Sequence, residues 1–149
     1  MLKIPPPVIG LLLAATMWLL SSYLPVYRFE FPWQNLVATL VLIGGLSIDF
    51  SALWCFIKAK TTINPLQPQQ TSKVVTTGIY RYSRNPMYLG MLIILTATAL
   101  YLGALTAFLL LPVFVWIITL NQIIPEERIL QKKFGQPYVN YLVSVRRWL

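Results

Sequence analysis

Two short polar motifs lie at the ends of the most apolar stretch of this sequence. The first is Arg84-Asn85-Pro86 and the second is the acid pair Glu126-Glu127. The sequence contains no histidine, which excludes a Ser-His-Asp triad, an HExxH zinc site and a histidine proton shuttle. Any catalysis must therefore use Arg, Lys, Tyr, Asn, Glu or backbone groups.

The residues between the two motifs determine how the motifs lie relative to one another. Residues 85–125 carry no charge, and as one helix they would extend about 60 Å, twice the thickness of a hydrocarbon core. They must therefore fold back, and residues 101–104 (YLGA) mark the turn. Because a hairpin that crosses the bilayer returns to the face it left, we expect the two polar motifs to lie close together.

Together the motifs offer groups that bind ions of both signs. Asn85 suits the N-cap of the following helix, and Pro86 suits its first position, where the missing N–H costs nothing. The free N–H groups of that helix start and the Arg84 guanidinium would bind an anion, whereas Glu126 and Glu127 would bind a cation. This set predicts a ligand that carries both a carboxylate and cationic groups.

Composition places the chain among membrane proteins. Hydrophobic residues make up 57% of it, charged residues make up 11%, and the mean hydropathy is +0.66. The net charge of +8 is explained by the positive-inside rule, and no basic face outside the short loops points to nucleic acid. The single Cys55 excludes disulfide frameworks and multi-cysteine zinc sites, and no metal site is expected.

We expect one all-α membrane domain with four transmembrane helices. The predicted spans cover residues 8–25, 35–57, 87–102 and 104–124. The polar segment 58–85 is predicted to form a loop, and residues 125–149 an amphipathic helical tail with a break at Gly135 and Pro137. The first span follows a single basic residue but has no signal-peptidase site, so we expect it to be retained.

The distribution of basic residues predicts the orientation in the membrane. Lys3 precedes the first span, Arg28 follows it, five basic residues fall in the loop 58–85 and five fall in the tail 125–149. By the positive-inside rule, both termini, the loop and the polar motifs lie on the cytoplasmic face. Membrane lipids are then direct partners, and we expect Arg146, Arg147 and Trp148 to contact their headgroups.

Both polar motifs belong to longer patterns that resemble a known family. The stretches are VVTTGIYRYSRNPMYLG (residues 74–90) and EERILQKKFGQPYVNY (residues 126–141), which contains E-E-x-x-L-x-x-x-F-G-x-x-Y-x-x-Y. In order and spacing they resemble the isoprenylcysteine carboxyl methyltransferase and phospholipid methyltransferase superfamily of integral membrane enzymes. The resemblance covers residues 61–146.

This resemblance implies a methyltransferase that uses S-adenosylmethionine. Its acceptor would be lipophilic and enter from the bilayer, with the carboxylate or amine of a prenylated or lipid-like substrate as the methylated group. The cofactor would bind between the cytoplasmic ends of the last spans and the tail, without a soluble Rossmann domain. The implied catalytic residues are Arg84, Glu126 and Glu127. The implied cofactor contacts are Lys73, Val74, Val75, Tyr80, Asn85, Pro86, Met87, Tyr88, Glu126 and Glu127.

Two positions depart from the family's pattern. Many relatives have histidine where this chain has Asn85, so Asn85 serves only as a cap and hydrogen-bonding group. The prenylcysteine enzymes place an arginine four residues before the first glutamate to meet the substrate carboxylate, and here that residue is Gln122.

Methyl transfer from a sulfonium is an in-line displacement that requires positioning and no covalent intermediate, so the lack of histidine is compatible with it. An amine acceptor would have to lose a proton, and Glu126 or Glu127 is the carboxylate in reach.

The same residues admit other interpretations. A small four-span transporter or binding protein would depend on the intramembrane Asp49 and not on the glutamate pair. A reductase-like relative with a similar Arg-x-Pro motif would use a nicotinamide cofactor. Arg84 could be only a positive-inside anchor, and Glu126 and Glu127 could only complement a helix macrodipole.

Overall fold

The computed structural model describes residues 4–59 and 73–149, and within them every regular element is helical. In chain order the elements are α1 (Pro6–Tyr23), α2 (Gln34–Ala59), the short 3-10 helix η2 (Gly78–Arg81), α3 (Pro86–Leu102), α4 (Leu105–Phe108), α5 (Leu110–Ile118), the π-helical turn η3 (Thr119–Ile123), α6 (Ile124–Phe134) and α7 (Gln136–Ser144). The described residues contain no β-strand, only one bridge between Arg28 and Ala104. The predicted all-α class is confirmed.

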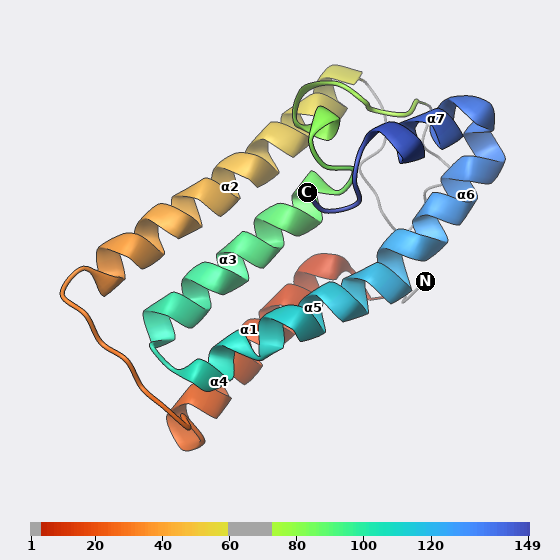
Figure 1. The fold of residues 1–149 in the computed structure, drawn as a ribbon. Coiled ribbons are helices and arrows are strands. Elements are labelled where there is room, and N and C mark those ends of the chain that lie inside the picture. Colours follow the sequence, from red (N-terminus) through yellow and green to blue (C-terminus); the bar gives the residue numbers. More distant parts are fainter. Residues whose placement is uncertain (1–3, 60–72) are drawn as a thin grey trace.

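Within the described residues, three helices are long and apolar enough to cross a membrane. They are α1, α2 and the helical path Leu105–Phe134, which joins α4, α5, η3 and α6. α1 has 18 residues and α2 has 26, lengths of about 27 and 39 Å. α3 is apolar but has only 17 residues, about 25 Å, slightly less than the thickness of a hydrocarbon core. α3 lies alongside α2 (Figure 1).

Prolines set both ends of α1. Pro6 occupies the first helical position, where its lack of an N–H removes no hydrogen bond. At the other end the helix stops at Tyr23, because Pro25 disfavours a helical conformation at Leu24. The helix therefore coincides closely with the first predicted span.

α3 begins and ends where the sequence predicted. Pro86 takes its first position, as in α1. After Leu102 the chain turns at Gly103, whose φ of 60° is left-handed and whose N–H bonds to the Ala99 carbonyl (3.2 Å). The turn in the long apolar stretch thus falls within residues 101–104.

The path from α4 to α6 differs from the prediction. The sequence predicted a span over residues 104–124 and a tail that begins at Pro125. Instead, the helix contains the π-helical turn η3 and continues through Pro125 to Phe134. Pro125 has no N–H to donate within a helix, and the wider π turn before it lets the helix continue without that hydrogen bond. Glu126 and Glu127 therefore lie inside a helix.

α2 and α3 approach each other closely where two glycines meet. A Cβ on Gly45 would lie 3.0 Å from the carbonyl oxygen of Gly90, and a Cβ on Gly90 would lie 3.0 Å from that of Gly45. The Asp49 carboxylate occupies the space beside Gly90 that a Cβ would need. The absence of side chains at these two positions therefore sets the spacing of the helices.

The main core lies between α1, α3 and the path from α4 to η3. Met17, Phe114, Ile118 and Ile123 are fully buried there. On the outer faces of α1 and α2, many large apolar side chains are exposed, including Leu11, Leu12, Trp18, Leu40, Ile43, Leu46, Phe50 and Trp54. Soluble proteins rarely expose so large an apolar surface, so these faces fit a lipid environment.

One end of the helix bundle carries the polar motifs. It holds the end of α2, η2, the start of α3, and the tail helices α6 and α7 (Figure 1). Gly135, with a φ of 60°, separates α6 from α7 at the predicted break. Tyr138 and Tyr141 are the buried residues of α7. The tail is thus amphipathic and covers the start of α3.

Candidate active site

The last residues of the chain lie across the turn that precedes α3. The Arg84 N–H donates to the Arg146 carbonyl (3.0 Å), and the Asn85 Nδ2 donates to the Arg147 carbonyl (2.9 Å). The Asn85 N–H donates to the Ser83 hydroxyl (3.1 Å), and Ser83 is 1% exposed. These bonds fix the first polar motif against the end of the chain.

Glu127 joins three segments through its carboxylate. Oε1 lies 3.3 Å from Arg84 Nη2, in the turn before α3. Arg147 donates from Nε to Oε1 (3.1 Å) and from Nη2 to Oε2 (2.7 Å), a bidentate pair. The hydrogen bonds to Glu127 raise the pKa of Arg147. The side chains of Arg84 and Glu127 are only 10% and 15% exposed, so Glu127 clamps the turn, α6 and the tail together.

Glu126 points into a pocket of about 280 Å³. There its carboxylate accepts a hydrogen bond from the Tyr88 hydroxyl of α3. The pocket is lined by Pro6, Pro7, Phe56, Tyr80, Arg84, Asn85, Met87, Tyr88, Met91 and Glu126. The two adjacent glutamates therefore face different surroundings, one a pocket and the other a pair of arginines.

The buried tyrosines Tyr80, Tyr138 and Tyr141 have raised pKa values and stay protonated. Burial raises the pKa of Tyr80, and the neighbouring Tyr141 and Glu126 raise it further. Burial also raises the pKa of Tyr138, with a further contribution from Glu127. The Tyr141 hydroxyl donates to the Tyr80 carbonyl (2.8 Å). These hydroxyls can act as hydrogen-bond donors and not as bases.

The structure brings together most of the predicted site residues. Those that line the pocket are Tyr80, Arg84, Asn85, Met87, Tyr88 and Glu126. Pro86 is buried at the start of α3 and Glu127 is held by arginines, so neither lines the pocket. The expected convergence of the two polar motifs is thus present in the ion pair between Arg84 and Glu127.

The predicted contacts at Lys73, Val74 and Val75 lie outside the pocket lining. Lys73 is exposed, Val74 is half-buried, and Val75 is buried against Ala52 and Tyr80. This stretch therefore supports the pocket through Tyr80, and its direct contact with a cofactor stays a prediction.

The predicted N-cap position of Asn85 is confirmed, but its side chain does not cap the helix. Its Nδ2 instead donates to the Arg147 carbonyl (2.9 Å). The return of the chain over this turn offers the amide a partner that the local sequence does not contain.

The tail differs from its predicted role, and Gln122 lies away from the pocket. Arg147 pairs with Glu127, and Trp148 Nε1 donates to Thr119 Oγ1 (3.3 Å), so neither side chain is free for lipid headgroups as predicted. Gln122 is fully buried, and its Nε2 donates to the Ile4 carbonyl (3.2 Å). Gln122 therefore lies outside the pocket and ties η3 to the start of the chain.

The sequence reasoning missed four residues of the pocket. Pro6 and Pro7 come from the start of α1, Phe56 from the end of α2, and Met91 from α3. The signal that could have found them is the predicted orientation, which places the start of the first span and the end of the second at the same face as the polar motifs.

Arg84, which lines the pocket, has a buried donor, Nε, without a partner within the described residues. Since buried polar groups are normally hydrogen-bonded, this N–H is suited to an anionic group of a ligand. The Glu126 carboxylate lines the same pocket and suits a cationic group. The residues present therefore fit a ligand with a carboxylate and positive charges.

An apolar cavity of about 590 Å³ adjoins this pocket. The two share Pro7, Met87 and Met91. The other residues that line the cavity come from α1, α2 and α3 and are Gly10, Leu11, Ala14, Leu46, Asp49, Phe50, Leu53, Ile94, Leu95 and Thr98. The polar pocket therefore adjoins a largely hydrocarbon space that opens at the surface, where Leu11, Leu46 and Phe50 are exposed.

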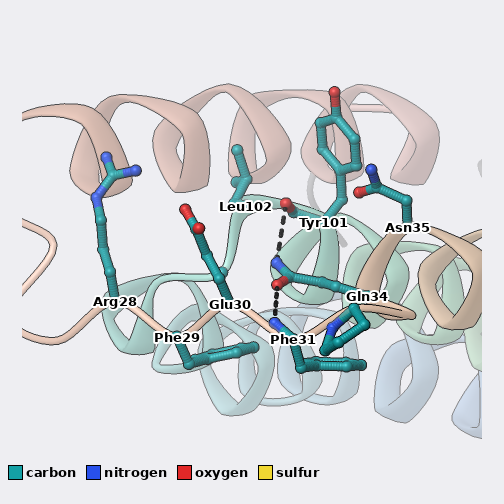
Figure 2. Close-up of a pocket in the computed structure, with 10 residues that line it drawn as sticks. Arg28, Phe29, Glu30, Phe31, Gln34, Asn35, Tyr101 and Leu102 are labelled. Atoms are coloured by element: carbon teal, nitrogen blue, oxygen red, sulfur yellow. Dashed lines mark hydrogen bonds between the residues drawn. The ribbon is translucent and has the colours of Figure 1, made fainter.

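A second polar pocket, of about 430 Å³, lies at the opposite end of the bundle. Figure 2 shows Gln34 at its centre, accepting from the Phe31 N–H (3.3 Å) and donating to the Tyr101 carbonyl (3.4 Å). The Arg28 side chain donates to the Ser21 carbonyl (2.6 Å). This pocket contains none of the predicted site residues, and its polar groups hold the loop between α1 and α2.

Comparison with known proteins gives a family and several relatives. Residues 33–137 match the phospholipid methyltransferase family. An uncharacterized protein of Haemophilus influenzae is 46% identical over 63 residues, which cover 42% of this chain and 100% of that protein. Protein-S-isoprenylcysteine O-methyltransferase B of Arabidopsis thaliana is 28% identical over 112 residues, 75% of this chain and 56% of the plant protein. Protein-S-isoprenylcysteine O-methyltransferase of Schizosaccharomyces pombe is 37% identical over 72 residues, 48% of this chain and 30% of the yeast protein.

No solved structure matches the chain significantly. The match to the family covers most of the chain, including the pocket residues of α3 and both glutamates. The chain spans about half the length of the plant enzyme and less than half the length of the yeast enzyme. The chain belongs to the phospholipid methyltransferase family.

Proposed function

We propose that this protein is an integral membrane methyltransferase that uses S-adenosylmethionine to methylate a lipophilic acceptor. The observation that carries the proposal is the continuity of two spaces. A polar pocket with Arg84, Tyr88 and Glu126 adjoins an apolar cavity between α1, α2 and α3. The first suits the charged part of a cofactor, and the second suits a hydrocarbon chain.

The proposed arrangement in the membrane has four spans. α3 is 17 residues long, and it is covered by α2 on one side and by α1 and α5 on another, so we infer that it crosses the bilayer with them. By the positive-inside rule, the basic loop and tail support a cytoplasmic location for both termini and the polar pocket. An acceptor held in the bilayer would reach the pocket through the apolar cavity.

Three pocket residues, Arg84, Tyr88 and Glu126, have proposed roles that follow from their chemistry. S-adenosylmethionine supplies a methyl group bound to a positively charged sulfur. The Arg84 Nε–H, which is buried and has no partner among the described residues, would bind the carboxylate of the cofactor. The Glu126 carboxylate stabilises the cationic groups, and the hydrogen bond from Tyr88 orients it. These contacts contribute mainly by positioning.

The names of the plant and yeast relatives indicate O-methylation of a prenylated cysteine. A carboxylate acceptor of that kind needs no base, because it is already a nucleophile. An amine acceptor must lose a proton, and Glu126 is the one carboxylate among the described residues that line the polar pocket. We therefore propose a lipophilic carboxylate or amine as the methylated group.

Calorimetry on the purified full-length protein tests this proposal. We expect saturable S-adenosylmethionine binding that weakens roughly tenfold or more in Glu126→Gln, since the variant loses a charge-assisted contact. Glu30→Gln is the control, because Glu30 lines the pocket at the opposite end of the bundle. Absence of saturable binding to the wild-type protein, or equal losses in both variants, would contradict the proposal.

The reductase alternative is tested in the same experiment. NADPH replaces S-adenosylmethionine in a second titration of the wild-type protein. Saturable NADPH binding in a protein that does not bind S-adenosylmethionine would favour the reductase.

A further inference from the structure

The apolar cavity contains one carboxylate, and the contacts of that carboxylate are unusual. Among the described residues that line the cavity, Asp49 of α2 is the only charged one. Its Oδ1 is buried and has no hydrogen-bond partner within the described residues. Thr98 also lines the cavity, but its hydroxyl donates to the Ile94 carbonyl (3.0 Å) and so does not donate to Asp49.

The packing of α2 on α3 holds Asp49 in this position. Gly90 has no Cβ, and the Asp49 carboxylate fills the space where a Cβ would stand. Gly45 and Gly90 keep the two helices close on the same side. A leucine at position 49 would suit an apolar wall better, since a buried polar group without a partner is destabilising. One oxygen of the carboxylate, Oδ1, is therefore left without a partner among the described residues.

The distance of Asp49 from the polar pocket limits what that partner can be. Phe56 lines the polar pocket and lies seven residues after Asp49 on the same helix, which corresponds to about 10 Å along its axis. A chain whose head lies at the Phe56 end of the polar pocket therefore meets Asp49 near its middle. Because a hydroxyl both donates and accepts, it fits Asp49 in either protonation state.

We propose that the methyl acceptor carries a hydroxyl group in the middle of its hydrocarbon chain, and that Asp49 selects this acceptor by hydrogen bonding to the hydroxyl. The inference rests on the proposed function, because it takes the apolar cavity as the site of the acceptor chain. It adds that the chain is functionalised and not a plain hydrocarbon. Asp49 is thus a specificity-determining residue of the acceptor site.

Competitive lipid binding, measured by native mass spectrometry on the full-length protein in detergent, tests the inference. The probes are octadecanoate, 10-hydroxyoctadecanoate and 2-hydroxyoctadecanoate, which share head and chain length and differ in the hydroxyl. We expect the wild-type protein to prefer the 10-hydroxy probe over the other two by roughly five- to tenfold, the value of one buried hydrogen bond.

Three variants make the result specific. Asp49→Leu should bind the three probes alike, and Asp49→Asn should keep the preference, because an amide also donates and accepts. Ser47→Ala is the matched control on α2, since Ser47 lies outside the cavity and its hydroxyl bonds to the Ile43 carbonyl (2.7 Å). Equal binding of the probes to the wild-type protein, or a preference that persists in Asp49→Leu, would overturn the inference.

The outcome can be separated from that of the proposed function, because the assay involves no cofactor. A protein that prefers the 10-hydroxy probe but does not bind S-adenosylmethionine supports the cavity inference and contradicts the methyltransferase. A protein that binds S-adenosylmethionine and shows no probe preference contradicts the cavity inference alone.

Discussion

At the scale of single residues, Glu126 and Glu127 are neighbours with separate tasks. Successive residues of a helix point about 100° apart, so one carboxylate reaches the pocket with Tyr88 and the other reaches Arg84 and Arg147. The sequence predicted that both glutamates belong to the site. It could not assign them, because their directions depend on the rotation of α6 about its axis and on a partner from the end of the chain.

Loss of the Glu127 charge should weaken the fold more than it changes the pocket. Glu127→Gln keeps the shape but leaves the largely buried Arg84 without its ion pair, so we expect the free energy of unfolding to fall by about 2 kcal/mol. Chemical unfolding in detergent measures this. Arg146→Gln is the control, because the Arg146 side chain is exposed. Equal stability of Glu127→Gln and the wild-type protein would show that the clamp contributes nothing.

At the scale of elements, the contact between α2 and α3 depends on glycine. Gly90→Ala would place a Cβ onto the Asp49 carboxylate and 3.0 Å from the Gly45 carbonyl, so the helices must separate or Asp49 must move. We expect a loss of about 1–3 kcal/mol in unfolding free energy. Gly44→Ala is the matched control, since a Cβ there meets nothing within 4 Å and alanine favours the helix.

A double variant tests whether the Asp49 carboxylate causes the loss of stability in Gly90→Ala. If the Asp49 carboxylate is the main obstacle, adding Asp49→Ala to Gly90→Ala should recover part of the lost stability, and the two changes should not be additive. Equal stability of Gly90→Ala and Gly44→Ala would contradict the described packing.

Element boundaries differ in how far the sequence predicts them. The turn at Gly103 was predictable, because the uncharged stretch is too long for one span and glycine suits a left-handed cap. The continuation of the helix through Pro125 was not predictable. Proline usually ends a helix, and nothing in the local sequence marks the π turn at Thr119–Ile123. The rotation of α6, and with it the choice of which glutamate faces the pocket, follows from that turn.

At the scale of the whole molecule, the site forms from segments far apart in sequence. The hairpin argument predicted that the two polar motifs meet, and the ion pair between Arg84 and Glu127 bears this out. The return of the tail over the turn was not predictable, because it depends on the redirection of the chain at Gly135 and on hydrogen bonds to the backbone carbonyls of Arg146 and Arg147. Such backbone contacts leave no pattern in the sequence.

The orientation in the membrane can be tested by labelling with a membrane-impermeant maleimide. In a Cys55→Ser background, Glu30→Cys places a thiol in the connection between α1 and α2, and Lys132→Cys places one on the exposed face of α6. Because the basic residues gather at the α6 end, we expect intact cells to label Glu30→Cys, and Lys132→Cys to react only after permeabilisation. The reverse pattern would contradict the orientation. Labelling of both in intact cells would contradict the four-span arrangement. In that arrangement three spans lie between the two positions, so the two thiols must be on opposite sides of the membrane.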